Sequence, residues 1–192
     1  EQASVDYQRL SYNKNLWQRP DSRFRNVITN LEIFYDAIST VSGAEYIVDS
    51  SKKPIHGAFL KASESLDVYT IHLVRDSRSV AASKKGRKVR RDVIGKEILL
   101  PQHGAFKSSL EWNKINFIPL AAPQFKDRKL TLRYEDFVRE PSMLTQRLNE
   151  LLGQQYEIPA SLLNKEVDAK GNHTALGNPM RLEAKKIKIK EN

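Results

Sequence analysis

The sequence predicts an α/β fold in which helices cover both faces of a mainly parallel sheet. Three short runs rich in aliphatic, β-branched or aromatic residues have the length of buried strands: residues 45–49, 69–74 and 129–133. Helix-like segments alternate with these runs, and that alternation is typical of a parallel sheet. Because 192 residues suffice for one sizeable core, we expect a single domain over residues 1–192, with irregular or peripheral ends at 1–20 and 182–192.

Two helices are predicted before the second strand. The first begins at Asp21 or Ser22, which are preferred N-cap types, and ends at Gly43. Its apolar side chains keep the spacing of one helix face: Val27, Ile28, Leu31, Phe34, Tyr35, Ile38 and Val41. The second covers residues 54–63 and supplies the crossover that a parallel strand pair requires.

The second strand stops at Arg75, and the residues after it predict another helix. Asp76 and Ser77 are N-cap types, and residues 80–82 form an apolar stripe. A guanidinium at the carboxyl end of a strand, beside exposed helix N–H groups, makes an anion pocket, and open α/β sheets bind ligands at that edge. The alternative is an Arg–Asp surface pair at an ordinary strand–helix turn.

The second half of the chain predicts two more helices. Residues 106–120 form one, and the other has Pro141 in its first turn and ends at Gly153. The leucines expected to face the core are Leu144, Leu148, Leu151 and Leu152. Residues 93–104 are predicted to form a loop or lid.

The charge favours an anionic partner. The chain has 32 basic and 23 acidic residues, a net charge of +9, and six of the eight residues 84–91 are basic. That cluster is either an electropositive rim or a solvated helix end.

There is no cysteine, so neither a disulfide nor a thiolate metal site is possible, and we expect no metal. No apolar run approaches the roughly 20 residues of a membrane span, and no signal-peptide pattern begins at Glu1. A cytoplasmic location is favoured, or the Golgi lumen if an upstream anchor exists.

Four blocks, in order, resemble the PAPS-dependent sulfotransferase family, where PAPS is 3′-phosphoadenosine 5′-phosphosulfate. L-V-R-D-S-R-S-V-A-A-S at residues 73–83 is similar to the family's 3′-phosphate-binding segment, in which Ser follows Arg by eight positions. The other blocks are V-D-S-S-K at 48–52, L-R-Y-E-D-F-V-R-E-P at 132–141 and G-N-P-M-R at 177–181. The resemblance implies a three-layer, P-loop NTPase-like sulfotransferase fold and transfer of a sulfuryl group to an acceptor hydroxyl or amine.

The resemblance also implies which residues bind the nucleotide, as PAPS or as its product PAP. Arg75 and Ser83 would hold the ribose 3′-phosphate. Arg181, with the backbone around Gly177 and Asn178, would close over the same phosphate. Tyr134 would reach the adenine, unless it is a core tyrosine at a strand end.

On the acceptor side, Lys52 is the candidate for stabilising the sulfuryl oxygens and Asp49 the candidate general base. An exposed Lys52, and an Asp49 that caps a helix or pairs with Lys52, are the alternatives. Cytosolic relatives use a His in this region, but neither His56 nor His72 falls at an equivalent position, and His72 is more simply a core residue. His173 is a candidate nucleotide contact.

The chain departs from the family in two places. It has no glycine before Gly43, so the Gly-rich loop that holds the 5′-phosphosulfate is missing, and only eleven residues follow Arg181. We therefore expect a fragment whose fold is incomplete at the N-terminus, with doubtful activity on its own. The alternatives are a non-catalytic sulfotransferase-like scaffold and a basic nucleic-acid-binding domain. The acceptor, whether sugar, tyrosine, lipid or small alcohol, is not readable from the sequence.

Overall fold

The computed structural model describes residues 24–85, 89–90, 98–99, 104–168 and 186–188. The chain divides into two compact units. The first comprises residues 1–71 and 114–129, and the second residues 72–113 and 130–192. Four residues proposed above as nucleotide contacts lie outside the described residues: His173, Gly177, Asn178 and Arg181.

The first unit is built on two helices whose ends follow local sequence signals. Helix α2 (Arg25–Ser42) ends at Gly43, which adopts φ 64°, a conformation that disfavours residues with a Cβ. Helix α3 (Pro54–Lys61) has Pro54 in its first turn, where the missing N–H costs nothing. The end of α2 at Gly43 and the beginning of α3 at Pro54 both agree with the sequence prediction. The expected caps Asp21 and Ser22 lie outside the described residues.

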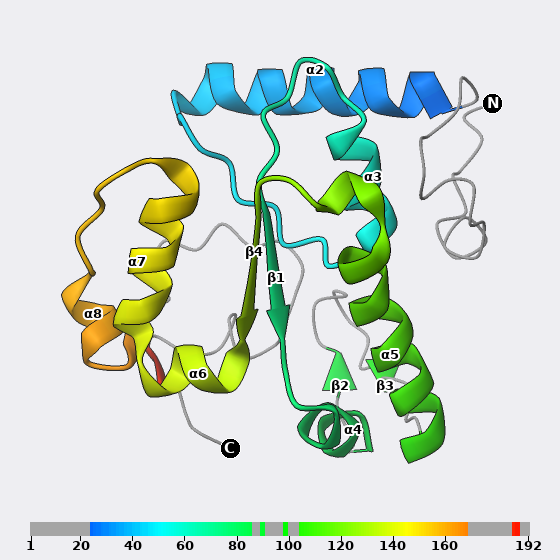
Figure 1. Cartoon of the computed structure of the whole chain (residues 1–192), viewed down its shortest axis with the longest axis vertical. Coiled ribbons are helices and arrows are strands. Elements are labelled where there is room, and N and C mark those ends of the chain that lie inside the picture. The colour runs from blue at the N-terminus through cyan, green and yellow to red at the C-terminus, as the bar shows by residue number, and fades with distance from the viewer. Residues whose placement is uncertain (1–23, 86–88, 91–97, 100–103, 169–185, 189–192) are drawn as a thin grey trace. The chain divides into compact units, whose positions relative to one another are not determined.

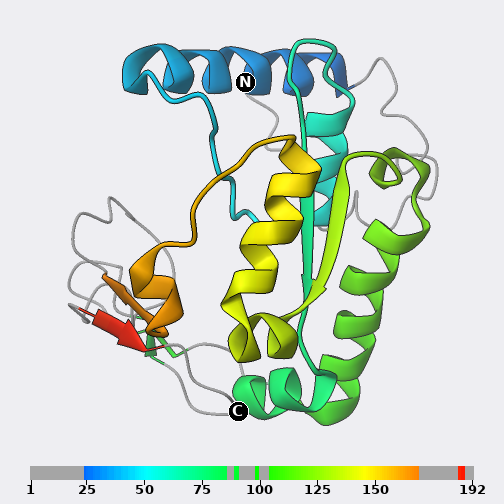
Figure 2. The ribbon, with the colours of Figure 1, turned by 60° about the vertical axis from the view of Figure 1, so that its left-hand side comes forward.

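Aromatic and aliphatic side chains join α2 to α3. Phe59 is fully buried, Ile55 is nearly so, and the Phe24 and Phe59 ring centroids are 5.3 Å apart. The partly buried residues around this cluster are Phe24, Val27, Ile28 and Leu31. Figures 1 and 2 both show α2 lying across α3. The apolar stripe read from the sequence therefore holds α2 in place through its N-terminal half.

A second cluster in the first unit involves the end of helix α5 (Ala105–Ala121) and the 3-10 helix η3 (Pro123–Phe125). Ala58, Ala122 and Phe125 are buried together, with Ile118 packed against them. Lys61, at the end of α3, links the chain segments that precede β1 (Thr70–Val74) and β4 (Lys129–Arg133), because its Nζ donates to the carbonyls of Val68 and Asp127 at 3.0 and 2.9 Å.

One of the strand pairs among the described residues is parallel. Strand β1 (Thr70–Val74) lies parallel to strand β4 (Lys129–Arg133). His72, Leu130 and Leu132 are buried, whereas Ile71 and Leu73 are about half exposed. The alternation shows that one face of the pair is well covered. The chain is therefore a mixed helix and strand protein with a parallel strand pair.

The prediction of a buried strand at residues 45–49 is wrong. These residues form no strand, and Tyr46, Ile47 and Val48 are exposed, Val48 to 87%. An apolar run becomes a strand only where a neighbouring backbone satisfies its N–H and C=O groups. No strand in the described part of the chain pairs with this run.

The second unit contains helices α4 (Ser77–Lys85), α6 (Tyr134–Arg139), α7 (Pro141–Leu152) and α8 (Ala160–Leu163). Pro141 begins α7, and Gly153 ends it with φ 65°, as predicted. Two antiparallel strand pairs complete the unit: β2 (Val89–Arg90) with β3 (Ile98–Leu99), and β5 (Glu166–Asp168) with β6 (Lys186–Lys188).

Both antiparallel pairs include residues expected to be irregular. Strand β3 lies within the predicted loop 93–104, and β6 lies within the predicted peripheral segment 182–192. Strand β5 carries acidic residues and β6 carries lysines, so Lys188 Nζ lies 3.6 Å from Glu166 Oε1 across the pair. Charge complementarity between distant segments is not visible in a local pattern.

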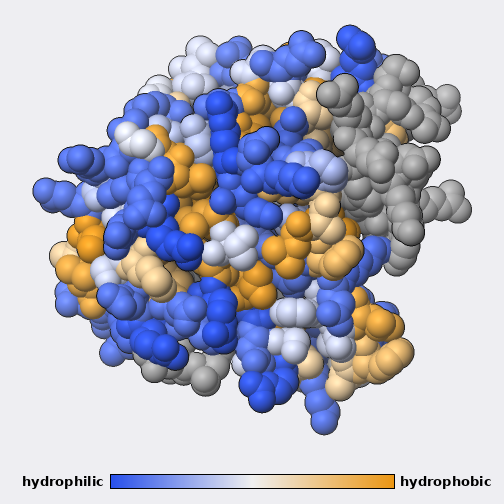
Figure 3. Space-filling model, viewed as in Figure 1, coloured by the Kyte–Doolittle hydropathy of each residue, from blue (hydrophilic) through white to orange (hydrophobic). Residues whose placement is uncertain are grey.

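Apolar side chains interrupt the hydrophilic surface (Figure 3). On α2, Ile33 and Phe34 are 62% and 56% exposed, and on α5 Phe106 is 78% exposed. No helix in the described ranges is long and apolar enough to span a bilayer.

Candidate functional site

Arg75 follows directly after β1 and places its guanidinium over an aromatic ring. Its Cζ lies 5.0 Å from the centroid of Tyr134, the first residue of α6. Trp112 on α5 donates its indole N–H to the Arg75 carbonyl at 2.8 Å, which holds the backbone at this point. The Arg75 backbone is thus held by Trp112, and its side chain lies against Tyr134.

The charge of Arg75 is not balanced by a carboxylate in the described part of the chain. Its neighbour Asp76 pairs with Arg78 instead, at 2.9 Å, so the Arg75–Asp76 surface pair considered above is not formed. The Nε atom of Arg75 is buried without a hydrogen-bond partner among the described residues. A partly buried guanidinium whose Nε lacks an acceptor, and which has no counter-charge among the described residues, is unfavourable, and a bound anion would supply both.

Asp76 occupies the amino end of α4, as its N-cap type predicts. Its Oδ1 accepts from the backbone N–H groups of Arg78 and Ser79 at 2.8 and 3.2 Å. Its own N–H donates to Glu135 Oε1 at 2.8 Å. The side chain of Arg78 and the backbone of Ser79 lower the pKa of Asp76 to about 2. The expectation that exposed helix N–H groups help to bind an anion here is therefore wrong for Arg78 and Ser79, because a carboxylate already binds them.

Ser83 and the start of the basic cluster lie near the end of α4. The segment between Arg75 and Ser83 is helical from Ser77 onward, as predicted, and Ser83 is half-buried. Lys84 forms an ion pair with Glu111 of α5 at 2.7 Å, and Lys85 is exposed. One cation of the predicted rim therefore belongs to a structural pair.

Tyr134 is half-buried at the beginning of α6. Besides facing Arg75, its ring packs edge-on against Phe137, with centroids 6.5 Å apart. The strand-end position and the contact with Arg75 place two of the predicted nucleotide residues together.

The acceptor-side candidates Asp49 and Lys52 lie in the first unit. Asp49 accepts hydrogen bonds from the Tyr35 hydroxyl, the Ser51 hydroxyl and backbone N–H, and His56 Nε2; the Ser51 N–H and His56 contacts are 2.7 and 2.8 Å. Lys52 is exposed and has a positive φ of 60°. The ion pair of Asp49 is with His56 rather than with Lys52.

These contacts determine the protonation states of Asp49 and Tyr35. Partial burial alone would raise the pKa of Asp49, but the hydrogen bonds from Ser51, Tyr35 and His56 together lower it to about 2. Burial, and then the adjacent carboxylate, raise the pKa of the Tyr35 phenol well above its usual value. At neutral pH the group therefore consists of a carboxylate and a neutral phenol.

Acid should weaken the first unit through Asp49. Because its folded pKa of about 2 lies below the ordinary 3.8, its contribution to stability is present above about pH 4 and is lost as the pH falls toward 2. Chemical unfolding at several pH values should show a steeper loss of unfolding free energy in this window for the wild type than for Asp49→Asn. The same pH dependence in both proteins would contradict this account.

Tyr35 and His56 were not predicted as members of this group. The helical spacing predicts Tyr35 on the apolar face of α2, and His56 does not match the position of the family's histidine. Their separations from Asp49, 14 and 7 residues, correspond to no single helix or strand period. Only the packing of α2 and α3 brings them to the carboxylate.

His72 lies in β1, 8% exposed, as expected for a core histidine. Among the residues that the structure describes, no cluster of three or more His, Asp or Glu side chains has metal-site geometry.

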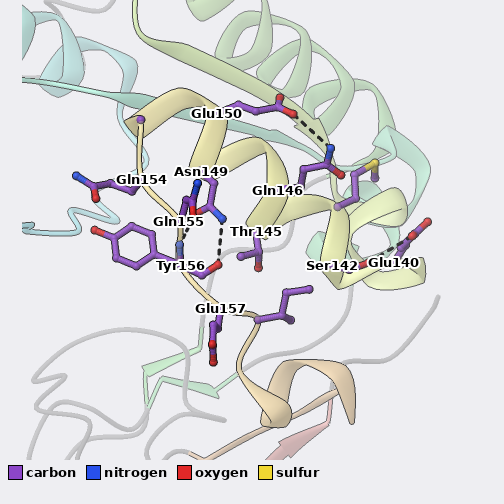
Figure 4. A pocket seen from close by; sticks show the side chains of 13 residues that line it. Glu140, Ser142, Thr145, Gln146, Asn149, Glu150, Gln154, Gln155, Tyr156 and Glu157 are labelled. Atoms are coloured by element: carbon purple, nitrogen blue, oxygen red, sulfur yellow. Dashed lines mark hydrogen bonds between the residues drawn. The ribbon is translucent and has the colours of Figure 1, made fainter.

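A separate open groove of about 1010 Å³ lies along α7 and residues 153–158 of the second unit (Figure 4). Asn149 anchors it by exchanging hydrogen bonds of 3.0 and 2.9 Å with the Tyr156 backbone. Its lining includes Glu140, Glu150 and Glu157 and no Lys or Arg. An acidic lining disfavours an anionic nucleotide, so this groove differs in chemistry from the surroundings of Arg75.

Comparison of the chain with protein-family models, with curated proteins and with solved structures finds no match.

Proposed function

We propose that this chain is part of a sulfotransferase that moves a sulfuryl group from PAPS to an acceptor hydroxyl or amine. The observation that carries the proposal is the Arg75 guanidinium at the carboxyl end of a parallel strand, which has no carboxylate partner among the described residues and whose Nε is buried. The aromatic ring of Tyr134 beside it suits a nucleoside phosphate, because a guanidinium binds phosphate and a ring packs against a base. In the proposal, the parallel pair β1–β4 belongs to the larger P-loop-like sheet of the sulfotransferase fold.

Arg75 and Ser83 take the ribose 3′-phosphate, which distinguishes PAPS from nucleotides that lack this group. Tyr134 takes the adenine side, and Gly177, Asn178 and Arg181 remain proposed contacts to the same nucleotide. Because Asp76 occupies the N–H groups of Arg78 and Ser79, the site relies on side chains more than on the end of α4. A charge-assisted contact to the phosphate is therefore the main source of selectivity.

The chemistry of sulfuryl transfer makes three demands on the protein. It must position donor and acceptor, stabilise charge on the bridging phosphate oxygen as the S–O bond breaks, and accept the proton of the acceptor. Lys52 is proposed to stabilise the charge on the bridging oxygen, since its ammonium group is exposed and can approach an anionic group. No metal is required in this scheme, as in the sequence-based expectation.

Retention on immobilised PAP tests the proposal. We expect the chain to be retained, and to be eluted by free PAP but not by AMP at the same concentration, because AMP lacks the 3′-phosphate. Release of PAP from PAPS in the presence of acceptors then separates a transferase from a non-catalytic scaffold. Equal elution by AMP would contradict the assignment. Binding to DNA that rises with length and falls steeply with salt would favour a nucleic-acid-binding domain instead.

A further inference from the structure

The open groove along α7 lies within the second unit and differs in charge from the rest of the chain. Three carboxylates line it, those of Glu140, Glu150 and Glu157, together with amide and hydroxyl side chains (Figure 4). The one basic residue of α7, Arg147, is not in this lining. The chain as a whole carries a net charge of +9, so the groove is a local region of negative potential on a basic molecule.

The described part of the chain leaves these carboxylates without a counter-charge. None of the three forms an ion pair with a residue that the structure describes. Their side-chain hydrogen bonds are long: Glu140 accepts from Ser142 Oγ at 3.3 Å, and Glu150 accepts from Gln146 Nε2 at 3.4 Å. The negative charges can therefore pair with a cation that enters the groove.

Thr145 provides a second observation, independent of the charge. It is only 8% exposed, yet it lines the groove, and Figure 4 shows its side chain directed from α7 into the space beside the segment that carries Glu157. Its hydroxyl forms no hydrogen bond with another residue in the described ranges. A polar group that is largely removed from water and lacks an internal partner is unfavourable, and a ligand in the groove would supply that partner.

The groove already contains one contact between a side-chain amide and a length of main chain. Asn149 Nδ2 donates to the Tyr156 carbonyl, and Asn149 Oδ1 accepts from the Tyr156 N–H. A side-chain amide carries both a donor and an acceptor, as a peptide group does, so it can pair with an extended backbone. Gln155 also lines the groove and is exposed, and its amide forms no such contact with the residues described.

The length of the groove sets the size of its ligand. The lining follows α7 from Ser142 to Gly153, which corresponds to about 16 Å at a helical rise of about 1.5 Å per residue. An extended chain covers the same distance with about five residues, at about 3.3 Å each. Alternate side chains of an extended chain lie on one face, so every second residue of such a ligand faces the groove.

We propose that this groove binds an extended segment of a partner protein, about five residues long, with lysine or arginine at alternate positions. The cations pair with the carboxylates, and the hydroxyl of Thr145 and the amide of Gln155 bind the backbone of the segment. A chain with a net charge of +9 repels a basic peptide at long range, so binding depends on the local acidic lining. The inference does not rest on the proposed function, because it involves no nucleotide and no residue assigned to one.

The first test is an NMR titration of the ¹⁵N-labelled full chain with a capped pentapeptide in which lysine alternates with alanine. We expect a Kd below about 1 mM. The resonances that shift should belong to α7 and residues 153–158, with the side-chain amides of Asn149 and Gln155 among them. The same peptide with glutamate in place of lysine should not bind. No binding of the lysine peptide, or shifts confined to other parts of the chain, would overturn the proposal.

The second test removes the charges of the groove. The combined variant Glu140→Gln, Glu150→Gln and Glu157→Gln should bind the lysine peptide at least about tenfold more weakly, because glutamine keeps the shape of the side chain without its charge. Added salt should weaken the binding of the wild type in the same direction.

A matched control removes the same number of charges from exposed residues of the first unit. The combined variant Asp36→Asn, Glu45→Gln and Glu64→Gln should bind the peptide within about twofold of the wild type. If both combined variants lost affinity alike, the effect would come from net charge, and the groove would not be the site.

The third test separates recognition of a peptide from recognition of charge. Thr145→Val should weaken peptide binding about two- to tenfold, the effect of one lost hydrogen bond. Its melting temperature should stay at the wild-type value, because the hydroxyl has no bond to lose within the described residues. Spermidine matches the charge of the peptide but has no peptide groups. Unchanged affinity in Thr145→Val, or displacement of the peptide by an equal concentration of spermidine, would overturn the proposal.

Discussion

Replacing Arg75 with alanine should lower the affinity for PAP by about 10- to 150-fold, equivalent to about 1.5–3 kcal/mol for a charge-assisted contact. The guanidinium has no carboxylate partner in the described residues, so no internal ion pair has to be broken when phosphate binds. The variant should remain folded, because the Trp112 bond is to the Arg75 carbonyl and survives the substitution. Isothermal titration with PAP, together with thermal unfolding, measures both effects.

Arg78→Ala is the matched control for Arg75→Ala. It removes the same charge three residues later, from a side chain that is 91% exposed and already paired with Asp76. We expect its affinity for PAP to stay within about twofold of the wild type, since exposed pairs contribute little. AMP should bind the wild type and Arg75→Ala equally. If Arg75→Ala bound PAP as the wild type does, or if both arginine variants lost affinity alike, the 3′-phosphate site would be misplaced.

Phe59→Ala should destabilise the first unit by about 3–5 kcal/mol, the usual cost of removing a buried phenyl group. Phe59 is completely buried and packs beside Ile55, with its ring against that of Phe24. The loss of this ring leaves a cavity between α2 and α3 that neither helix can close without moving. The unfolding free energy from urea titration, followed by far-UV circular dichroism, measures the effect.

Phe34→Ala provides the comparison for Phe59→Ala. Phe34 is also a phenylalanine of the first unit, but it is 56% exposed and its ring contact is with the adjacent Tyr35. We expect a loss below about 1 kcal/mol, as for most surface substitutions. Equal losses for the two variants would mean that α2 and α3 are not held together by the Phe59 cluster.

The elements with local signals were predicted closely. Strand β4 has the predicted bounds, β1 begins one residue later than predicted, and α5 extends one residue further at each end. Gly43, Pro141 and Gly153 mark helix ends because each acts through its own backbone geometry. The placement of Arg75 at a strand end, with Tyr134 at another, follows from the same local patterns.

The structure differs from the prediction where a residue's role depends on a distant partner. Residues 45–49 have the composition of a strand, but no strand among the described residues pairs with them, whereas β6 forms because its backbone pairs with that of β5. The amino end of α4 is closed by Asp76 and Glu135, although the sequence suggested that it was open.

The sequence alone determined where β1, α4 and β4 lie, which residues end the main helices, and that Arg75 stands at the end of a strand. These properties depend on backbone preferences and on periodicity within a few residues. Only the tertiary structure decided that Arg75 has no carboxylate partner among the described residues, and that Asp49 accepts hydrogen bonds from Tyr35 and His56. The contacts that bring Tyr35 and His56 to Asp49, and Trp112 to Arg75, join groups 7 or more residues apart, and their separation carries no periodic signal.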